Sequence, residues 1–157
     1  MPNTQSIGVA YSDQAMSGGS VDNSPIGATT PSTIVGTTMY GTAEIGYTAG
    51  AQGTVTQLTD KSTGVTLNKS AGRITMNNAA LGGATAVSFI LTNSLISAND
   101  TIIVNIGSNT TGSAAGAYAV YVSYLAAGSA LITLRNLTAA TSYSEAVVIN
   151  YSILHGA

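Results

Sequence analysis

The sequence predicts an all-β fold: an antiparallel, jelly-roll-like β-sandwich of about eight strands, preceded by an extended N-terminal arm. From Gly53 onward, short runs rich in β-branched residues alternate with turn residues. Residues 1–52 hold all three prolines of the chain and keep neither a helical nor a strand period. No candidate helix exceeds two turns, and the absence of cysteine excludes disulfides and thiolate metal sites.

The strands of the sandwich are predicted from residue periodicity and turn signals. The pattern is clear in one segment, where Val87, Phe89 and Leu91 alternate with more polar positions. Clusters such as Asp60–Gly64 and Ala126–Gly128 carry turn chemistry. We expect strands near residues 53–59, 64–68, 72–76, 85–92, 100–106, 117–125, 129–136 and 144–154. Residues 53–157 are therefore predicted to form one sandwich domain.

Residues 1–52 are predicted to be a docking arm. Apolar side chains spaced along an extended, proline-punctuated segment suit an arm that lies on another subunit and fills successive pockets. A disordered tail is the alternative, because polar segments rich in glycine and proline are often disordered. The side chains that we expect to contact a partner protein are Ile7, Val9, Tyr11, Ile26, Pro31, Ile34, Met39, Tyr40 and Tyr47 of the arm, with Tyr121 of the sandwich.

The chain carries very little charge. Only 6% of its 157 residues are charged, whereas soluble globular proteins have about 25%. Four basic residues and a net charge of -2 cannot neutralise a row of phosphates, which argues against a nucleic-acid partner. No apolar run approaches the roughly 18 residues of a membrane span, and the N-terminus lacks a secretory signal. We expect a protein made in the cytoplasm that keeps no membrane contact and remains bound to a protein partner.

The acidic residues of the predicted sandwich do not suggest a catalytic pair. Asp60 and Asp100 lie at predicted turns, where an aspartate usually bonds its own backbone. Glu145 opens a predicted strand and is expected to pair with Arg135 across a hairpin. A polysaccharide hydrolase would need two of these three acids to face one cleft, and the sequence does not place them together.

The remaining reactive residues also lack the partners that chemistry requires. His155 is the third residue from the C-terminus and has no cysteine or nearby acid, so we interpret it as a surface residue. No serine has the Gly-x-Ser-x-Gly setting of a hydrolase nucleophile, and no glycine-rich phosphate loop is present. The sequence therefore predicts no enzyme activity, no cofactor and no metal site.

Three tyrosines fall in the predicted strand 117–125. A period of two places Tyr118 and Tyr124 on one face with Val120 and Val122, whereas Tyr121 points the other way. One interpretation puts Tyr118 and Tyr124 in the core, with their hydroxyls near its rim. The other makes Tyr121 an exposed aromatic anchor for a subunit contact or a sugar.

Two stretches resemble structural proteins of tailed-phage virions. Ser24–Pro31 (SPIGATTP) resembles an Ile-Gly-x-x-Thr-Pro stretch of phage fibre and other virion proteins, and Val55–Leu81 is similar to a segment of phage structural proteins. Together they cover roughly a fifth to a quarter of the chain. The resemblance implies a β-rich fold, trimeric or higher symmetric assembly and no cofactor, and it supplies no catalytic residue.

The sequence thus leads to the hypothesis of a structural virion protein on the outer capsid surface. The first form of the hypothesis is a capsid decoration (cement) protein that trimerises on the shell, with its arm along the major capsid protein or a neighbouring copy. The alternative is a head or tail fibre, or receptor-binding tip, that recognises a host surface glycan. We expect self-association, because strand edges and surfaces without charged side chains are not protected from pairing with other chains. Burial in an oligomer would cover them.

Overall fold

The computed structural model describes residues 36, 38, 40–108 and 116–156. The chain divides into two compact units, Met1–Thr42 and Ala43–Ala157. The second unit contains one short 3-10 helix, η1 (Ala49–Ala51), and eight strands. The strands are β1 (Gln52–Thr56), β2 (Val65–Thr66), β3 (Ala71–Thr75), β4 (Ala86–Thr92), β5 (Thr101–Ser108), β6 (Tyr118–Ala126), β7 (Ser129–Asn136) and β8 (Val148–Leu154).

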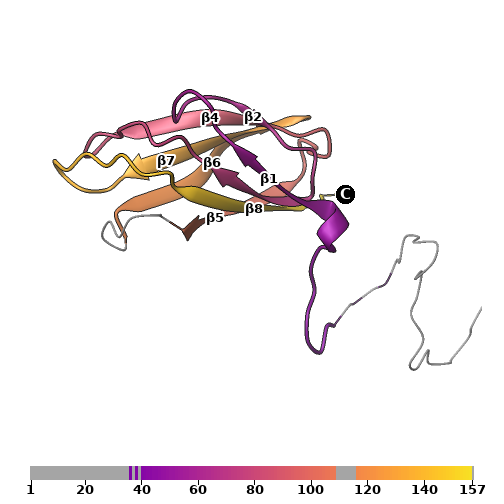
Figure 1. The fold of residues 1–157 in the computed structure, drawn as a ribbon. Helices are drawn as coiled ribbons and strands as arrows, with labels where there is room; N and C mark the ends of the chain where they lie inside the picture. The colour runs from indigo at the N-terminus through magenta and orange to yellow at the C-terminus, as the bar shows by residue number, and fades with distance from the viewer. Residues whose placement is uncertain (1–35, 37, 39, 109–115, 157) are drawn as a thin grey trace, which may run out of the picture. The chain divides into compact units, whose positions relative to one another are not determined.

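The strands form two four-stranded sheets, which Figure 1 shows as two layers. The first sheet has the order β1-β3-β8-β5 and the second β2-β4-β7-β6. The β1–β3 and β2–β4 pairs are parallel, and the other pairs are antiparallel. The all-β sandwich is thus as predicted, but the prediction of purely antiparallel sheets was wrong.

The parallel pairs follow from the way the chain winds around the core. Strands β1, β2, β3 and β4 alternate between the two sheets, so each strand returns one full turn later beside an earlier strand of the same sheet. A strand that returns after a complete turn runs in its neighbour's direction. Only β6 and β7 form a tight hairpin among the described strands, and Gly128, at φ +79°, supplies the left-handed residue that this two-residue turn needs.

Both sheets direct apolar side chains into one core. In β8, for example, Ile149, Tyr151 and Ile153 are buried, while Asn150 and Ser152 between them are only partly buried. This is the alternation of a strand with one face inward. The large apolar side chains that are almost completely buried come from both sheets and from the loop that follows β3. They include Phe89, Ile74, Met76, Leu91, Ile132, Leu134, Ile149 and Ile153.

A buried polar pair joins the core to the loop before β3. The Asn93 amide donates to the carbonyl oxygen of Lys69 at 2.8 Å and accepts from the Leu95 N–H at 3.0 Å. The Tyr151 hydroxyl lies 3.1 Å from the Leu67 carbonyl oxygen and 3.0 Å from that of Lys69. Burial raises the pKa of Tyr151 to about 12, although the Asn93 contact opposes this. These bonds satisfy polar groups that would otherwise be costly to bury.

The segment before β1 belongs to the sandwich unit. The Tyr47 hydroxyl donates to the Ile153 carbonyl, the Gln52 side chain donates to the Tyr47 carbonyl at 2.7 Å, and Lys69 Nζ donates to the Gly50 carbonyl at 2.8 Å. The compact unit therefore begins at Ala43, earlier than the expected start at Gly53. Within the described part of the chain, no helix is long and apolar enough to cross a membrane.

Candidate interaction surfaces

The outer face of the second sheet carries a group of apolar side chains that we call the tyrosine face: Ile90, Tyr121, Tyr124 and Leu131. Ile90 is 51% exposed, Tyr121 46% and Tyr124 65%. The strand register places Ile90, Leu131 and Tyr124 in one row across β4, β7 and β6. Two tyrosine rings and an aliphatic row are thus available to a partner on one flat face.

A β-bulge at Ser123 brings both tyrosines to this face. The pairing of β6 with β7 is regular up to Val122 and resumes at Tyr124, which leaves Ser123 as an extra residue. An extra residue reverses the alternation beyond it, so Tyr124 points outward. The prediction that Tyr124 shares the core face with Tyr118 was therefore wrong, whereas Tyr118 is buried as that interpretation expected.

Hydroxyl groups stiffen the sheet beneath the tyrosine face. Thr133 is only 5% exposed although it lies on the outer side of β7. Its Oγ1 lies 2.8 Å from Ser88 Oγ and 2.7 Å from Ser123 Oγ, and Ser123 also donates to the Leu131 carbonyl at 3.2 Å. The bulge is thereby tied to the strands beside it, so the positions of the two tyrosines are set by hydrogen bonds as well as by register.

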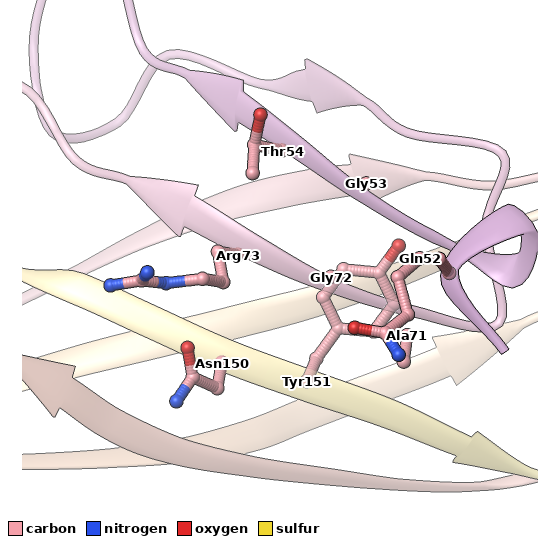
Figure 2. Close-up of a pocket in the computed structure, with 9 residues that line it drawn as sticks. Gln52, Gly53, Thr54, Ala71, Gly72, Arg73, Asn150 and Tyr151 are labelled. Atoms are coloured by element: carbon pink, nitrogen blue, oxygen red, sulfur yellow. The ribbon is translucent and has the colours of Figure 1, made fainter. Parts of the chain in front are cut away.

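The outer face of the first sheet holds a shallow hollow of about 480 Å³, shown in Figure 2, which we call the Arg73 hollow. Arg73 and Asn150 are register partners on β3 and β8, and their side chains lie side by side, with Thr54 of β1 beyond Arg73. The small side chains of Ala49 and Ala71 leave the space open. The walls thus combine a guanidinium, an amide and a hydroxyl.

Arg73 and Asn150 both have hydrogen-bonding capacity to spare. Arg73 is exposed, and the single ion pair found among the described residues joins His155 to Asp100 instead. The Oδ1 of Asn150 is buried and accepts no hydrogen bond within the described part of the chain. Gly107 of β5 makes room for this amide, because a Cβ at that position would lie 2.7 Å from it. Arg73 is thus the group in the hollow that can bind an anion, since the spare Asn150 oxygen is itself an acceptor.

A second, more apolar hollow lies on the same outer face. It has a volume of about 370 Å³, and Ile45, Tyr47, Ser152 and Leu154 are in its walls. Ile45 is 76% exposed and Leu154 54% exposed. Ile103 of β5, the register partner of Ser152, is 50% exposed. We call this the Leu154 hollow, and its chemistry suits an aliphatic side chain.

Some of the charged side chains of the sandwich are buried. Lys61 is 3% exposed, and its Nζ donates to the carbonyl oxygens of Asn77 and, at 2.6 Å, of Glu145. Burial lowers the pKa of Lys61, and the Glu145 carboxylate opposes that shift. Burial and then Glu145 raise the pKa of Tyr118. Gln57 completes this Lys61 cluster by donating to the carbonyls of Lys61 and Thr63.

Glu145 lies elsewhere than the sequence suggested. It precedes β8 in the loop after β7, it is 6% exposed, and its charged neighbour is Lys61. Arg135 is exposed on the outer face of the second sheet, beside Ala119 and Ala86. The predictions that Glu145 opens a strand and pairs with Arg135 were therefore wrong. The Lys61 cluster is a structural element that fastens three loops together.

The two predicted turn aspartates do bond their turns. Asp60 accepts hydrogen bonds from the Ser62 N–H and hydroxyl, which lower its pKa. Asp100 accepts from the Ser97 N–H and hydroxyl, and also from the Gly156 N–H and His155. The main-chain bond from Ser97 is the largest cause that lowers the pKa of Asp100 to about 2.

His155 is exposed, as predicted, but the expectation that it has no acid nearby was wrong. Its Nδ1 lies 3.1 Å from Asp100 Oδ2, so the pair fastens the last described residues to the turn before β5. None of Asp60, Asp100 and Glu145 is in the wall of the Arg73 or Leu154 hollow. A search of the described residues for three or more metal-ligating side chains close together found none.

The predicted contact residues fall into two groups. Seven of them, Ile7, Val9, Tyr11, Ile26, Pro31, Ile34 and Met39, lie outside the described residues. Tyr40 is 89% exposed. Tyr47 is bonded to Ile153 and lines the Leu154 hollow, and Tyr121 is on the tyrosine face. The structure brings Tyr121 together with Tyr124, which sequence reasoning had assigned to the core.

Sequence reasoning missed Arg73, Asn150 and Tyr124 as surface candidates. A signal existed for Arg73, because among the residues of the eight strands only Arg73 and Arg135 are charged. No local signal marked Asn150, whose role depends on the pairing of β8 with β3 and β5. In comparisons with known proteins, no protein-family model, curated protein or solved structure matches the chain.

Proposed function

We propose that the protein is a structural component of a phage virion, a capsid decoration (cement) protein that assembles on the outer shell, most simply as a homotrimer. The observation that carries the proposal is the absence of charge from the edge strands. All four edge strands, β1, β5, β2 and β6, lack charged residues and proline. Monomeric sheets protect their edges with such residues, with very short strands or with β-bulges. β2 has only two residues, and β5 and β6 each contain a register irregularity; burial against other chains is the explanation that we propose for the uncharged edges.

The virion part of the proposal rests on the sequence resemblance in Ser24–Pro31 and Val55–Leu81. Its threefold part rests on the same resemblance and on the threefold positions that capsids offer. The jelly-roll-like relation also stays a proposal. Insertion of the late strands β7 and β8 between earlier strands supports it, while the parallel β1–β3 and β2–β4 pairs depart from it.

Addition of the full-length protein to expanded capsid shells tests this function. The shells are assembled from the major capsid protein of the phage to which the proposal assigns this chain, and electron microscopy of the mixture looks for regular density on the outer surface. We expect saturable binding with threefold density. A chain starting at Ala43 tests the arm, provided that circular dichroism shows it folded. Unchanged shell affinity without the arm would contradict a docking role for residues 1–42, and no binding by the full chain would refute the cement function.

The tyrosine face favours the second candidate, a fibre or receptor-binding tip that recognises a host glycan. Tyr121 and Tyr124 are exposed together, and hydroxyl groups of Ser88 and Ser123 accompany them. Flat aromatic rings beside polar groups suit the apolar faces and hydroxyls of sugars. A glycan array separates the two candidates. A receptor-binding tip should bind a defined glycan, and the variants Tyr121→Ala and Tyr124→Ala should lose that binding, whereas a pure cement protein should bind no glycan.

A further inference from the structure

The charge of the chain is divided unevenly between its two units. All four basic residues lie in Ala43–Ala157, together with four acidic residues, so this unit has no formal net charge. Met1–Thr42 contains Asp13 and Asp22 and no basic residue, so it carries the entire net charge of -2. Any ion pair between the N-terminal unit of one copy and the sandwich of another would therefore join an arm carboxylate to a sandwich cation.

Arg73 is the sandwich cation best placed to receive a carboxylate. It is the only charged residue in β1, β3, β8 and β5, and it forms no ion pair with the described residues. A hollow of about 480 Å³ lies beside it, and Asn150 offers an amide there. A guanidinium binds a carboxylate through two parallel hydrogen bonds. The lone arginine of the other sheet, Arg135, is in the wall of neither described hollow.

The neighbouring Leu154 hollow gives the site a second, apolar part. Asn150, the register partner of Arg73, and Leu154 are four residues apart on β8, a distance of about 13 Å along a strand. In the arm, Ile26 follows Asp22 by four residues, so an extended arm spans the same distance. Asp13 is followed at that spacing by Ser17, which has no apolar side chain.

We propose that the arm of a second copy binds this face, with the Asp22 carboxylate on Arg73 and the Ile26 side chain in the Leu154 hollow. The inference deepens the proposed function and rests on its docking arm, because it names the segment, the receiving site and the partner. Exchange of arms between copies would link the sandwiches into one assembly and pair one of the two arm carboxylates of each chain with a cation of another.

A charge-swap experiment on the full-length chain tests the proposal. Arg73→Asp and Asp22→Arg each place like charges at the contact, so each alone is expected to weaken self-association about tenfold or more in sedimentation equilibrium. An equimolar mixture of the two variants is expected to restore association. In the mixture, Asp22 of the Arg73→Asp chain meets Arg73 of the Asp22→Arg chain, and the two introduced side chains, which have opposite charges, meet each other. Arg73 is exposed, and matching circular dichroism and melting temperatures show that the variants fold.

Two control variants make the outcome specific to Asp22. Asp13→Arg and Glu44→Arg reverse the other acids of the N-terminal region and are expected to leave Arg73→Asp unrescued on mixing. Rescue by either, or no rescue by Asp22→Arg, would overturn the assignment. Rescue only when both changes are in the same chain would show binding within one chain and overturn the role of a second copy. Shell binding is measured separately, so loss of shell binding with intact rescue would refute the cement function alone.

Discussion

Replacement of Lys61 by methionine tests whether the Lys61 cluster holds one end of the sandwich together. The Lys61 side chain is 3% exposed and donates to the carbonyl oxygens of Asn77 and Glu145. Methionine is similar in length but donates nothing, so two acceptors lose a partner and the Glu145 carboxylate loses a cationic neighbour. A buried acceptor without a partner costs about 1–3 kcal/mol, so the loss of a donor to two carbonyl oxygens is expected to cost about 2–6 kcal/mol.

We therefore expect Lys61→Met to lower the free energy of unfolding by about 2–6 kcal/mol, a large part of the roughly 5–15 kcal/mol of a typical domain. Urea denaturation followed by far-UV circular dichroism measures it. Arg135→Met is the matched control, since it removes an exposed cation, and should stay within about 0.5 kcal/mol of the wild type. Adding Glu145→Gln to Lys61→Met should recover part of the loss, because the buried charge is then gone.

The pH dependence of the same variant gives a second measurement. Burial lowers the pKa of Lys61 below its ordinary 10.5 in the folded state, so between the two pKa values the unfolded chain holds the extra proton. Stability of the wild type relative to Lys61→Met should therefore increase as the pH rises toward 10.5. A loss of less than about 1 kcal/mol at neutral pH, together with a flat pH difference, would refute the structural role of the Lys61 amine.

Three further changes test other buried polar groups. Asn136→Ala removes a completely buried amide that donates to two loop carbonyls, and the urea midpoint should show a loss of about 1–3 kcal/mol for each group left unpaired. Tyr151→Phe should lose about 1–3 kcal/mol. Because the pKa of Tyr151 is raised to about 12, its contribution is complete below about pH 10 and disappears as the pH rises through about 12. The pKa of Asp100 is lowered to about 2, chiefly by Ser97, so its contribution to stability is lost as the pH falls from about 4 to 2. In Asp100→Asn the melting temperature should therefore change less over that pH range than in the wild type.

The eight strands could be predicted from the sequence because their signals are local. Alternation in segments such as Ala86–Thr92 and the turn at Ala127–Gly128 depends on a few adjacent residues. The parallel pairing of β1 with β3 could not be predicted in this way, because it results from a complete turn of the chain around the core. The strand expected from residue 144 starts at Val148, because Glu145 is held in the loop by Lys61, a residue far away in sequence.

The candidate surfaces were harder to predict because they depend on exact register. Residues 118–124 alternate as a regular strand does, and nothing local marks Ser123 as the extra residue that moves Tyr124 outward. The hollow beside Arg73 requires that β1, β3 and β8 be adjacent, and that Gly107 of β5 leave room for Asn150. What the sequence did indicate was the general character of the surface, since composition alone predicted uncharged edges.

The distribution of charge separates the stability of one copy from the contacts between copies. Lys61, Asp100 and Glu145 are each less than 10% exposed and fasten loops and the last described residues. Most of a domain's charges normally lie on its surface, where they limit association. Here the strands leave only Arg73 and Arg135 for that purpose, one on each outer face. In the assembly that we propose, a sandwich whose charges fasten its loops, and whose edges and faces have almost none, is kept soluble mainly by association with other copies. In the contact that we propose, Asp22 of the arm adds specificity, because Arg73 is the only charged residue in the strands of the first sheet.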